Sequence, residues 1–289
     1  MLREGRALVA AALAAGLLSA CGGSGPAAKP AAPLTAKRVT AAAVLADAVR
    51  QLRAGGTGAF DAVTTSMADG FLQTRQVGGA FDLARNTWAG TIDLQVSAVG
   101  NPRVGGYAAR LAGHGTSLFV NVGRGAKGVQ GVRAGALGTN RWYRAATDGL
   151  PLAAGDLSGV RFLGRVRATA VRASGGGGQV VTGRLPAADA VSLLGLSQEI
   201  RRLKLGPKAM AGTAVVTVGL DPAGRIVRIR LAGTDVTFTG RAPRALRDLV
   251  AAASYAQTFH GLGDPVKIAL PRTATDAAGS LAVAARNVL

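Results

Sequence analysis

The segment 88–96 alternates between apolar and polar side chains, and this pattern constrains the fold more than any other feature of the chain. Trp88, Ile92, Leu94 and Val96 fall on one side of it. A period of two residues is what a strand with one buried face requires. Similar runs recur at 60–66, 80–84, 107–111, 117–122, 162–171, 179–183, 213–220, 225–231 and 235–239. The sequence therefore predicts about eight to eleven antiparallel strands.

Helical periodicity appears in only three segments, 40–53, 187–205 and 245–255. In the first, Val44, Leu45, Val49 and Leu52 share one helical stripe, and two glycines end the pattern. Residues 221–224 (Asp-Pro-Ala-Gly) predict a turn between two strands. A long antiparallel meander with a few helices is typical of a barrel, a half-barrel or a sandwich.

The first twenty residues have the layout of a secretory signal. Arg3 and Arg6 precede the apolar segment 7–18, which is too short to span a bilayer of roughly 30 Å as a lasting helix. Residues 18–21 (Leu-Ser-Ala-Cys) resemble the lipobox of bacterial lipoproteins. In that motif the cysteine sulfur receives a diacylglycerol and the preceding peptide bond is cut. The resemblance implies a signal peptide over 1–20 and lipid attachment at Cys21.

The alternative is an ordinary secretory peptide that leaves Cys21 as a stray thiol. Cys21 is the only cysteine of the chain, and an exposed single thiol is a liability in an oxidising compartment. Acylation explains both its presence and its lack of a partner. We therefore expect an extracytoplasmic protein that a lipid anchor tethers to the cell membrane.

The residues after Cys21 predict a tether and then one domain. The segment 21–34 is rich in glycine, proline and serine and has no apolar face, so it is expected to be flexible. The segment 35–275 is long enough for a single domain with a sizeable core. Residues 276–289 are expected to form a C-terminal tail.

The chain is strongly basic, with 34 Lys and Arg against 15 Asp and Glu and a formal net charge of +19. These charges are spread along the chain, and no basic stripe with interleaved aromatic residues is present. Nucleic acid is therefore excluded as the expected partner of this exported protein. Anionic lipid headgroups or acidic wall polymers fit the charge better.

Small side chains supply most of the expected buried face, and Gly79, Gly90, Gly164 and Gly183 lie within the strand patterns. Glycine in a strand often marks a bend or a close approach of another group. The interior of a curved sheet with few large aromatic rings is either left partly empty as a cavity or filled by Val and Leu side chains. Both alternatives stay open. The candidate cavity residues are Phe81, Leu83, Trp88, Ile92, Leu94, Val96, Phe162, Val166, Val216, Val218 and Phe238.

Two motifs resemble the LppX/LprG (LprAFG) lipoproteins of actinobacteria. Residues 218–228 (VGLDPAGRIVR) are similar to a hairpin of that family. The segment 255–271 is similar to the family's ending at Phe259, Gly263, Pro265, Val266, Ile268 and Pro271. The order of lipobox, spacer, helix, meander and ending also agrees.

This resemblance covers roughly residues 35–275 and implies a LolA/LolB-like fold of the α+β class. Its strongly curved antiparallel half-barrel has a few helices packed on the concave side and encloses a pocket for acylated lipids. The chain departs from the family in the segment 123–138, which is rich in glycine and basic residues. It also departs at 175–178, a run of four glycines expected to form a hairpin tip.

Motifs for catalysis are absent from the sequence. His114 and His260 are the only histidines, and neither has further metal-ligand residues at a suitable spacing. The sequence has no nucleophile elbow, zinc-protease motif or phosphate loop. We therefore expect neither an enzyme nor a metal or cofactor site.

Two functions remain open. The first is a monomeric, anchored carrier that sequesters acylated lipids or other lipophilic molecules in a hydrophobic cavity. The alternative is a non-enzymatic envelope binding or regulatory module with a filled core, which engages a protein or an anionic polymer through its basic surface.

Overall fold

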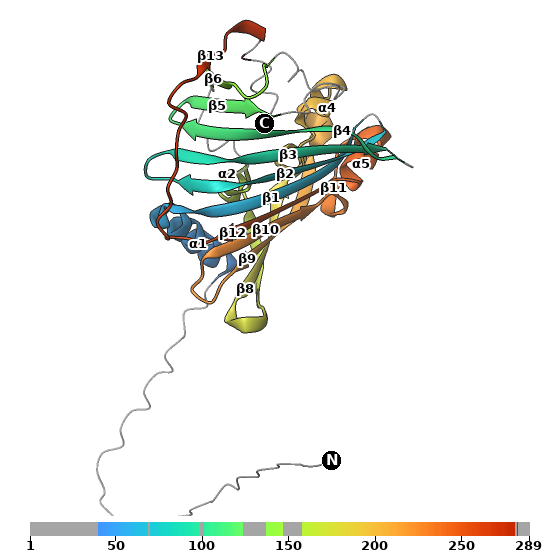
Figure 1. Cartoon of the computed structure of the whole chain (residues 1–289). Helices are drawn as coiled ribbons and strands as arrows, with labels where there is room; N and C mark the ends of the chain where they lie inside the picture. Colours follow the sequence, from blue (N-terminus) through green and yellow to red (C-terminus); the bar gives the residue numbers. More distant parts are fainter. Residues whose placement is uncertain are drawn as a thin grey trace, which may run out of the picture. The chain divides into compact units, whose positions relative to one another are not determined.

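One open sheet of thirteen strands dominates the computed structural model (Figure 1). The structure describes residues 40–68, 70–98, 101–123, 137–146, 158–280 and 282. Residues Val39–Leu289 form one compact unit. Cys21 and the predicted signal peptide and tether lie outside the described residues, as does most of the predicted C-terminal tail.

The strands follow the order β13-β6-β5-β4-β3-β2-β1-β12-β10-β9-β8-β7, and β11 pairs with β9. Among the described residues, every strand pair is antiparallel except that of β13 with β6. The strands are β1 Thr57–Ala68, β2 Phe71–Asp82, β3 Thr87–Ala98, β4 Asn101–His114, β5 Ser117–Val122, β6 Trp142–Ala146, β7 Arg167–Ala173, β8 Gln179–Pro186, β9 Gly212–Leu220, β10 Ile226–Ala232, β11 Val236–Phe238, β12 Ser254–His260 and β13 Thr275–Asp276.

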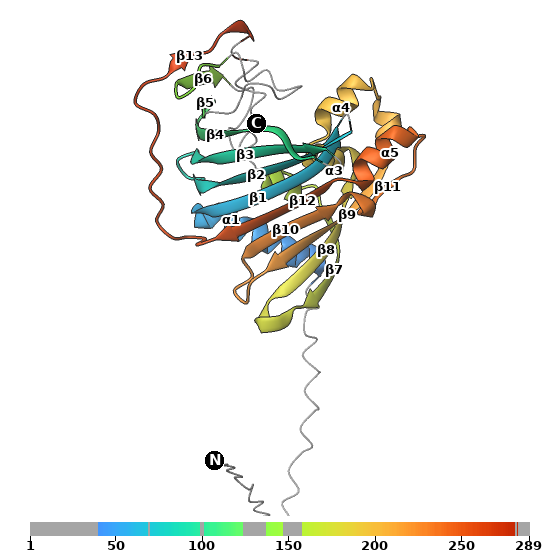
Figure 2. The same cartoon turned by 45° about the vertical axis from the view of Figure 1, so that its right-hand side comes forward.

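Strand β12 joins two halves of the sheet that are distant in sequence. It pairs with β1, where Phe259 lies opposite Phe60, and with β10, where Gln257 lies opposite Ile229. The meander β1–β6 is thereby continuous with β7–β10. The sheet does not close on itself, and its course in Figures 1 and 2 fits a curved half-barrel of the α+β class.

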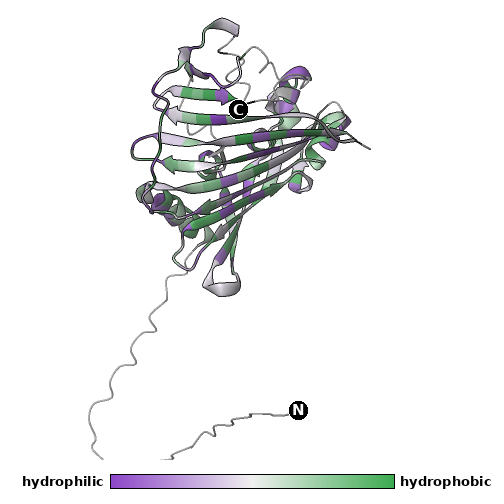
Figure 3. Ribbon diagram, viewed as in Figure 1, coloured by the Kyte–Doolittle hydropathy of each residue, from purple (hydrophilic) through white to green (hydrophobic). Residues whose placement is uncertain are grey.

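Alternation along the strands divides the sheet into two faces. Register places Ala62, Val77, Ile92, Ala109 and Val122 in one row across β1 to β5, and all five are buried. We call the face that carries this row the inner face and the opposite one the outer face. Hydrophobic and hydrophilic segments alternate along the strands in Figure 3.

The described α-helices are α1 Ala41–Gly55, α2 Ser158–Leu163, α3 Ala187–Leu193, α4 Ser197–Arg202 and α5 Arg244–Ala251. Helix α1 begins after Thr40, whose Oγ1 accepts a hydrogen bond from the N–H of Ala43 (3.2 Å). It packs on β7, β8 and β10, whereas α3 packs on β8, β9 and β11, and α5 packs on β1. None of the described helices combines the length and apolarity needed to cross a bilayer.

Thirteen strands exceed the predicted eight to eleven because the predicted runs contain no counterpart of β6, β12 or β13. Strand β13 has only two residues, too few to show a period. Strand β2 was predicted only over 80–84, since the polar stretch 73–76 interrupts its apolar alternation. The run 117–122 coincides with β5, and the run 88–96 lies within β3.

Three predicted elements are wrong in part. The predicted strand 162–171 begins as helix α2, and a turn follows in which the N–H of Arg165 donates to the carbonyl of Phe162 (2.9 Å). The predicted helix 187–205 breaks into α3 and α4 near Gly195, whose φ is 78°. The predicted helix 245–255 ends at Ala251, because β12 begins at Ser254. The four-glycine run does form the connection between β7 and β8, as predicted.

Candidate functional site

The inner face of β2 and β3 brings five of the predicted cavity residues together. Trp88, Ile92, Leu94 and Val96 lie at alternating positions of β3, and Phe81 of β2 lies opposite Trp88. All five are buried. The most exposed of them is Val96, at 8% of full solvent exposure. Strand periodicity alone therefore placed them on the correct side of the sheet.

Val216 and Val218 form a second group on the inner face of β9. Val218 lies opposite Val181 of β8 and Ile229 of β10, and all of these side chains are buried. Helix α1 packs on β8 and β10, and α3 packs on β8 and β9. This group therefore belongs to the half of the sheet that the described helices cover.

The four remaining candidates lie outside the long strands. Leu83 follows β2, Phe162 is in α2, Val166 is in the turn after α2, and Phe238 is in β11. All four are partly buried and pack against the core. The interpretation of Phe162 and Val166 as alternating residues of one strand is wrong, because their spacing of four residues belongs to a helix end and its turn.

Glycines within the sheet mark close approaches of the backbone. Gly79 and Gly90 are register partners, and a Cβ on either would overlap a carbonyl oxygen of the facing strand. Gly183 makes room for the side chain of Val166. Gly164 lies outside any strand, and the space around it is open. Close packing therefore explains the glycines at 79, 90 and 183.

Trp88 packs directly over Gly113, its register partner on β4. A Cβ on Gly113 would overlap the indole Nε1, so the ring needs a glycine beneath it. Trp88 is fully buried, and its Nε1 has no hydrogen-bond partner in the part of the chain that the structure describes.

Large aromatic rings fill part of the inner face, contrary to the expectation of a face with few rings. The ring centroid of Phe81 lies 6.4 Å from that of Phe60 and 6.2 Å from that of Phe259. On β12, the hydroxyl of Tyr255 donates to Oε1 of Gln257 (2.8 Å). Neither Phe60 nor Tyr255 is among the predicted cavity residues, although both fit the alternation of their strands.

One row of the inner face carries polar groups, which the strand alternation does not predict. Register places Thr64, Arg75, Leu94 and Tyr107 in one row across β1 to β4. Burial raises the pKa of Tyr107 to about 12, although the charge of Arg75 opposes the rise, so the phenol is neutral at physiological pH. Arg75 lies on the same face of β2 as Val77 and Phe81. Apolar alternation predicts apolar side chains on the buried face, so it does not predict a charged residue there.

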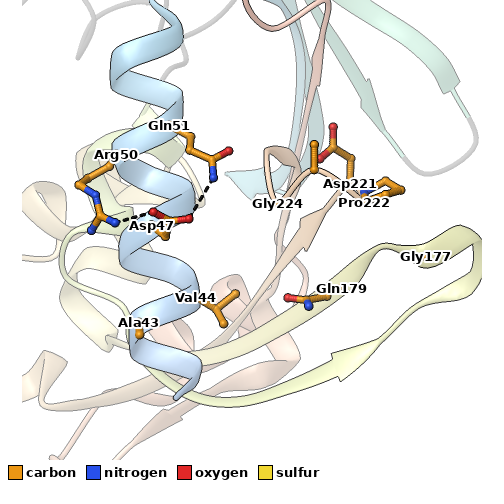
Figure 4. Close-up of a pocket in the computed structure, with 11 residues that line it drawn as sticks. Ala43, Val44, Asp47, Arg50, Gln51, Gly177, Gln179, Asp221, Pro222 and Gly224 are labelled. Atoms are coloured by element: carbon orange, nitrogen blue, oxygen red, sulfur yellow. Dashed lines mark hydrogen bonds and ion pairs between the residues drawn. The ribbon is translucent and has the colours of Figure 1, made fainter. Parts of the chain in front are cut away.

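A separate pocket of about 480 Å³ lies where α1 meets two hairpin tips (Figure 4). Helix α1 contributes Ala43, Val44, Asp47, Arg50 and Gln51 to the lining, and the turns contribute Gly177, Gln179, Asp221, Pro222, Ala223 and Gly224. None of the predicted cavity residues lines this pocket.

Arginine side chains already engage both carboxylates of the pocket. Asp47 accepts hydrogen bonds from Arg50 and from Gln51. Asp221 accepts from the backbone N–H (2.8 Å) and the Nε (2.7 Å) of Arg225. Burial acts to raise the pKa of Asp221, but the hydrogen bonds from Arg225 outweigh it and lower that pKa. The pocket is thus a polar junction between elements and does not resemble the predicted acyl-chain cavity.

Both histidines lie on the surface at strand ends. His114 ends β4, and Nε2 of His260 lies 3.1 Å from Oδ2 of Asp61. Within the described ranges, no group of three or more His, Cys, Asp or Glu side chains could hold a metal ion.

Comparisons with known proteins return lipoproteins of the group that the sequence motifs resemble. The structure is similar to that of lipoprotein LppX from Mycobacterium tuberculosis, with a TM-score of 0.38 and 14% identity over 80% of this chain and 100% of that one. It is similar to LprF from Mycobacterium bovis with the same TM-score and identity, over 80% of this chain and 96% of that one.

A DUF1329 family protein from Desulfovibrio piger is also similar, with a TM-score of 0.23 and 12% identity over 74% of this chain and 88% of that one. No protein-family model matches the chain, and no curated protein matches it by sequence. These TM-scores measure a distant likeness, so the evidence for function lies in the residues of this chain.

Proposed function

We propose that this chain is a lipid-anchored, extracytoplasmic, non-enzymatic lipoprotein that binds the acyl chains of a lipid or another lipophilic molecule. In this proposal the chains lie between the concave side of the half-barrel and the elements packed on it. The lipobox-like residues before Cys21, with the tether that follows, support the anchor.

The apolar inner face of β2 to β5 carries the binding proposal. It presents Trp88, Ile92, Leu111, Leu118 and Val120, all nearly or fully buried. The described helices make their main contacts with β1 and with β7 to β11. An apolar concave surface of this kind is what a lipid-sequestering site presents to acyl chains.

Hydrophobic sequestration supplies the binding free energy. Each buried methylene contributes about 0.8 kcal/mol, so a pair of long acyl chains gains far more than an exposed surface could provide. The row containing Arg75 and Tyr107 places polar groups beside Leu94 within the inner face. The chains are therefore expected against Trp88, Ile92 and Leu94, with the lipid's polar part toward Arg75.

Native mass spectrometry tests this proposal on the chain 22–289, produced without its anchor in a lipid-containing bacterial host. The wild-type chain is expected to carry lipid. Leu94→Arg places a charge on the apolar wall and should lower lipid recovery roughly tenfold or more. Gln95→Arg, one residue along on the outer face, is the matched control and should leave recovery unchanged.

Leu94→Arg also threatens stability, because an unpaired buried charge can unfold a domain. Val96→Phe adds volume without charge and should reduce lipid recovery while the chain stays folded by circular dichroism. A folded wild-type chain that carries no lipid would contradict the carrier proposal.

The second candidate is the envelope module that engages a protein or an anionic polymer. Exposed arginines on the outer face favour it, as described below. It predicts a folded chain that is free of lipid. In that case the protein's own side chains, Leu94 and Val96 among them, fill the core.

A further inference from the structure

Five arginines gather on the outer face of β7 to β10. They are Arg167 and Arg172 on β7, Arg184 on β8, and Arg228 and Arg230 on β10, and all five are exposed. Register brings them together across the four strands. Arg167 lies opposite Arg184, while Arg228 and Arg230 lie opposite Gly219 and Thr217 of β9.

No acidic residue interrupts this cluster. The other outward positions of these strands include Ala170, Thr182, Val215, Thr217 and Gly219. None of the five arginines takes part in an ion pair within the described part of the chain. Their charges are therefore available to a partner outside the domain.

An apolar side chain accompanies the charges. Val215 on β9 lies opposite Arg184 and is 39% exposed, although most valines of the sheet are buried. Four adjacent strands span roughly 15 Å, so the cluster is a broad, flat array of guanidinium groups. Guanidinium groups bind phosphate oxygens well.

Helix α1, with which the described part of the chain begins after Thr40, lies beside the same strands. Helix α1 follows the tether directly, and its residues Ala43 and Val44 share the pocket of Figure 4 with the β7–β8 and β9–β10 tips. The segment from Cys21 to Thr40 spans at most about 65 Å when fully extended. A chain anchored at Cys21 therefore keeps the whole domain, these four strands included, within reach of the membrane.

We propose that the outer face of β7 to β10 docks on a membrane surface of anionic phospholipids, with the five arginines facing the phosphate groups. This inference does not depend on whether the inner face holds a lipid. Docking would place the domain against the bilayer and not leave it free at the end of its tether.

Vesicle co-sedimentation of the unacylated chain 22–289 tests the inference. Binding is expected to phosphatidylcholine vesicles that contain phosphatidylglycerol, and not to phosphatidylcholine alone. Added salt should weaken it, since exposed charges are screened. The double variant Arg228→Gln/Arg230→Gln should lower the partition coefficient about tenfold.

The matched control is Arg141→Gln/Arg201→Gln, which removes the same charge from exposed sites outside β7 to β10. It should bind nearly as well as the wild type. Equal loss in both double variants would indicate a general charge effect and overturn the inference. Binding to a soluble polyphosphate but not to anionic vesicles would also overturn it and would favour the anionic-polymer module.

Discussion

Trp88 and Gly113 show how one pair of residues sets the packing of two strands. The indole covers the glycine, and the ring loses its exposure to water completely. Burial of a tryptophan ring stabilises the fold, whereas a buried N–H without a partner costs on the order of 1–3 kcal/mol. The net gain therefore depends on tight contact between the ring and the backbone of β4.

Gly113→Ala tests this dependence. A methyl group beneath the indole should force the ring or the strand to move and should lower the free energy of unfolding by about 1–3 kcal/mol. Denaturant unfolding measures the change. Gly175→Ala is the control, because the space around Gly175 is open, and it should be nearly neutral. Equal stability of both variants would show that Trp88 does not need the glycine.

Strand β13 has only two residues, and a backbone hydrogen bond and an ion pair join it to β6. Its two residues run parallel to β6, and the N–H of Ala277 donates to the carbonyl of Arg144 (2.8 Å). The guanidinium of Arg144 binds Asp276 through two hydrogen bonds, of 2.6 and 2.9 Å. Asp276 and Ala277, which the sequence assigned to the C-terminal tail, thus contact β6.

Asp276→Asn should therefore loosen β13 and speed hydrogen exchange at the N–H of Ala277. The hydrogen bonds from Arg144 lower the pKa of Asp276 below its ordinary value of 3.8. The stabilisation by the carboxylate is thus fully present above that value and is lost as the pH falls through the lowered pKa. Asp235→Asn removes an exposed carboxylate elsewhere and serves as the control. Unchanged exchange in Asp276→Asn would contradict the role of the ion pair.

For the molecule as a whole, the proposed anchor and the proposed docking face would act on the same membrane. Two acyl chains hold a protein firmly, whereas arginines on a surface give a weaker attraction that salt screens. The two contributions can therefore be separated by washing membranes with salt.

Cys21→Ala should abolish membrane retention after a high-salt wash and leave secreted or uncleaved chain. Fractionation of cells followed by detection of the chain measures this result. At low salt the variant should keep some binding if the outer-face arginines dock as proposed. Full retention of Cys21→Ala after the salt wash would contradict acylation at this residue.

Local patterns determined those features that depend on neighbouring residues. The alternation at 88–96 placed Trp88, Ile92, Leu94 and Val96 on one buried face, because successive side chains of a strand point to opposite sides. The stripe at 40–53 predicted α1, and residues 221–224 predicted the turn between β9 and β10, where Gly224 has a φ of 79°.

The tertiary structure alone decided which segments meet. The insertion of β12 between β1 and β10, and the row that joins Arg75 to Tyr107, depend on pairing between strands far apart in the chain. The same is true of Gly113 beneath Trp88 and of the five arginines gathered on β7 to β10. The period of two predicts on which face of its own strand a side chain lies. Which residues lie beside it on the adjacent strands depends on long-range packing.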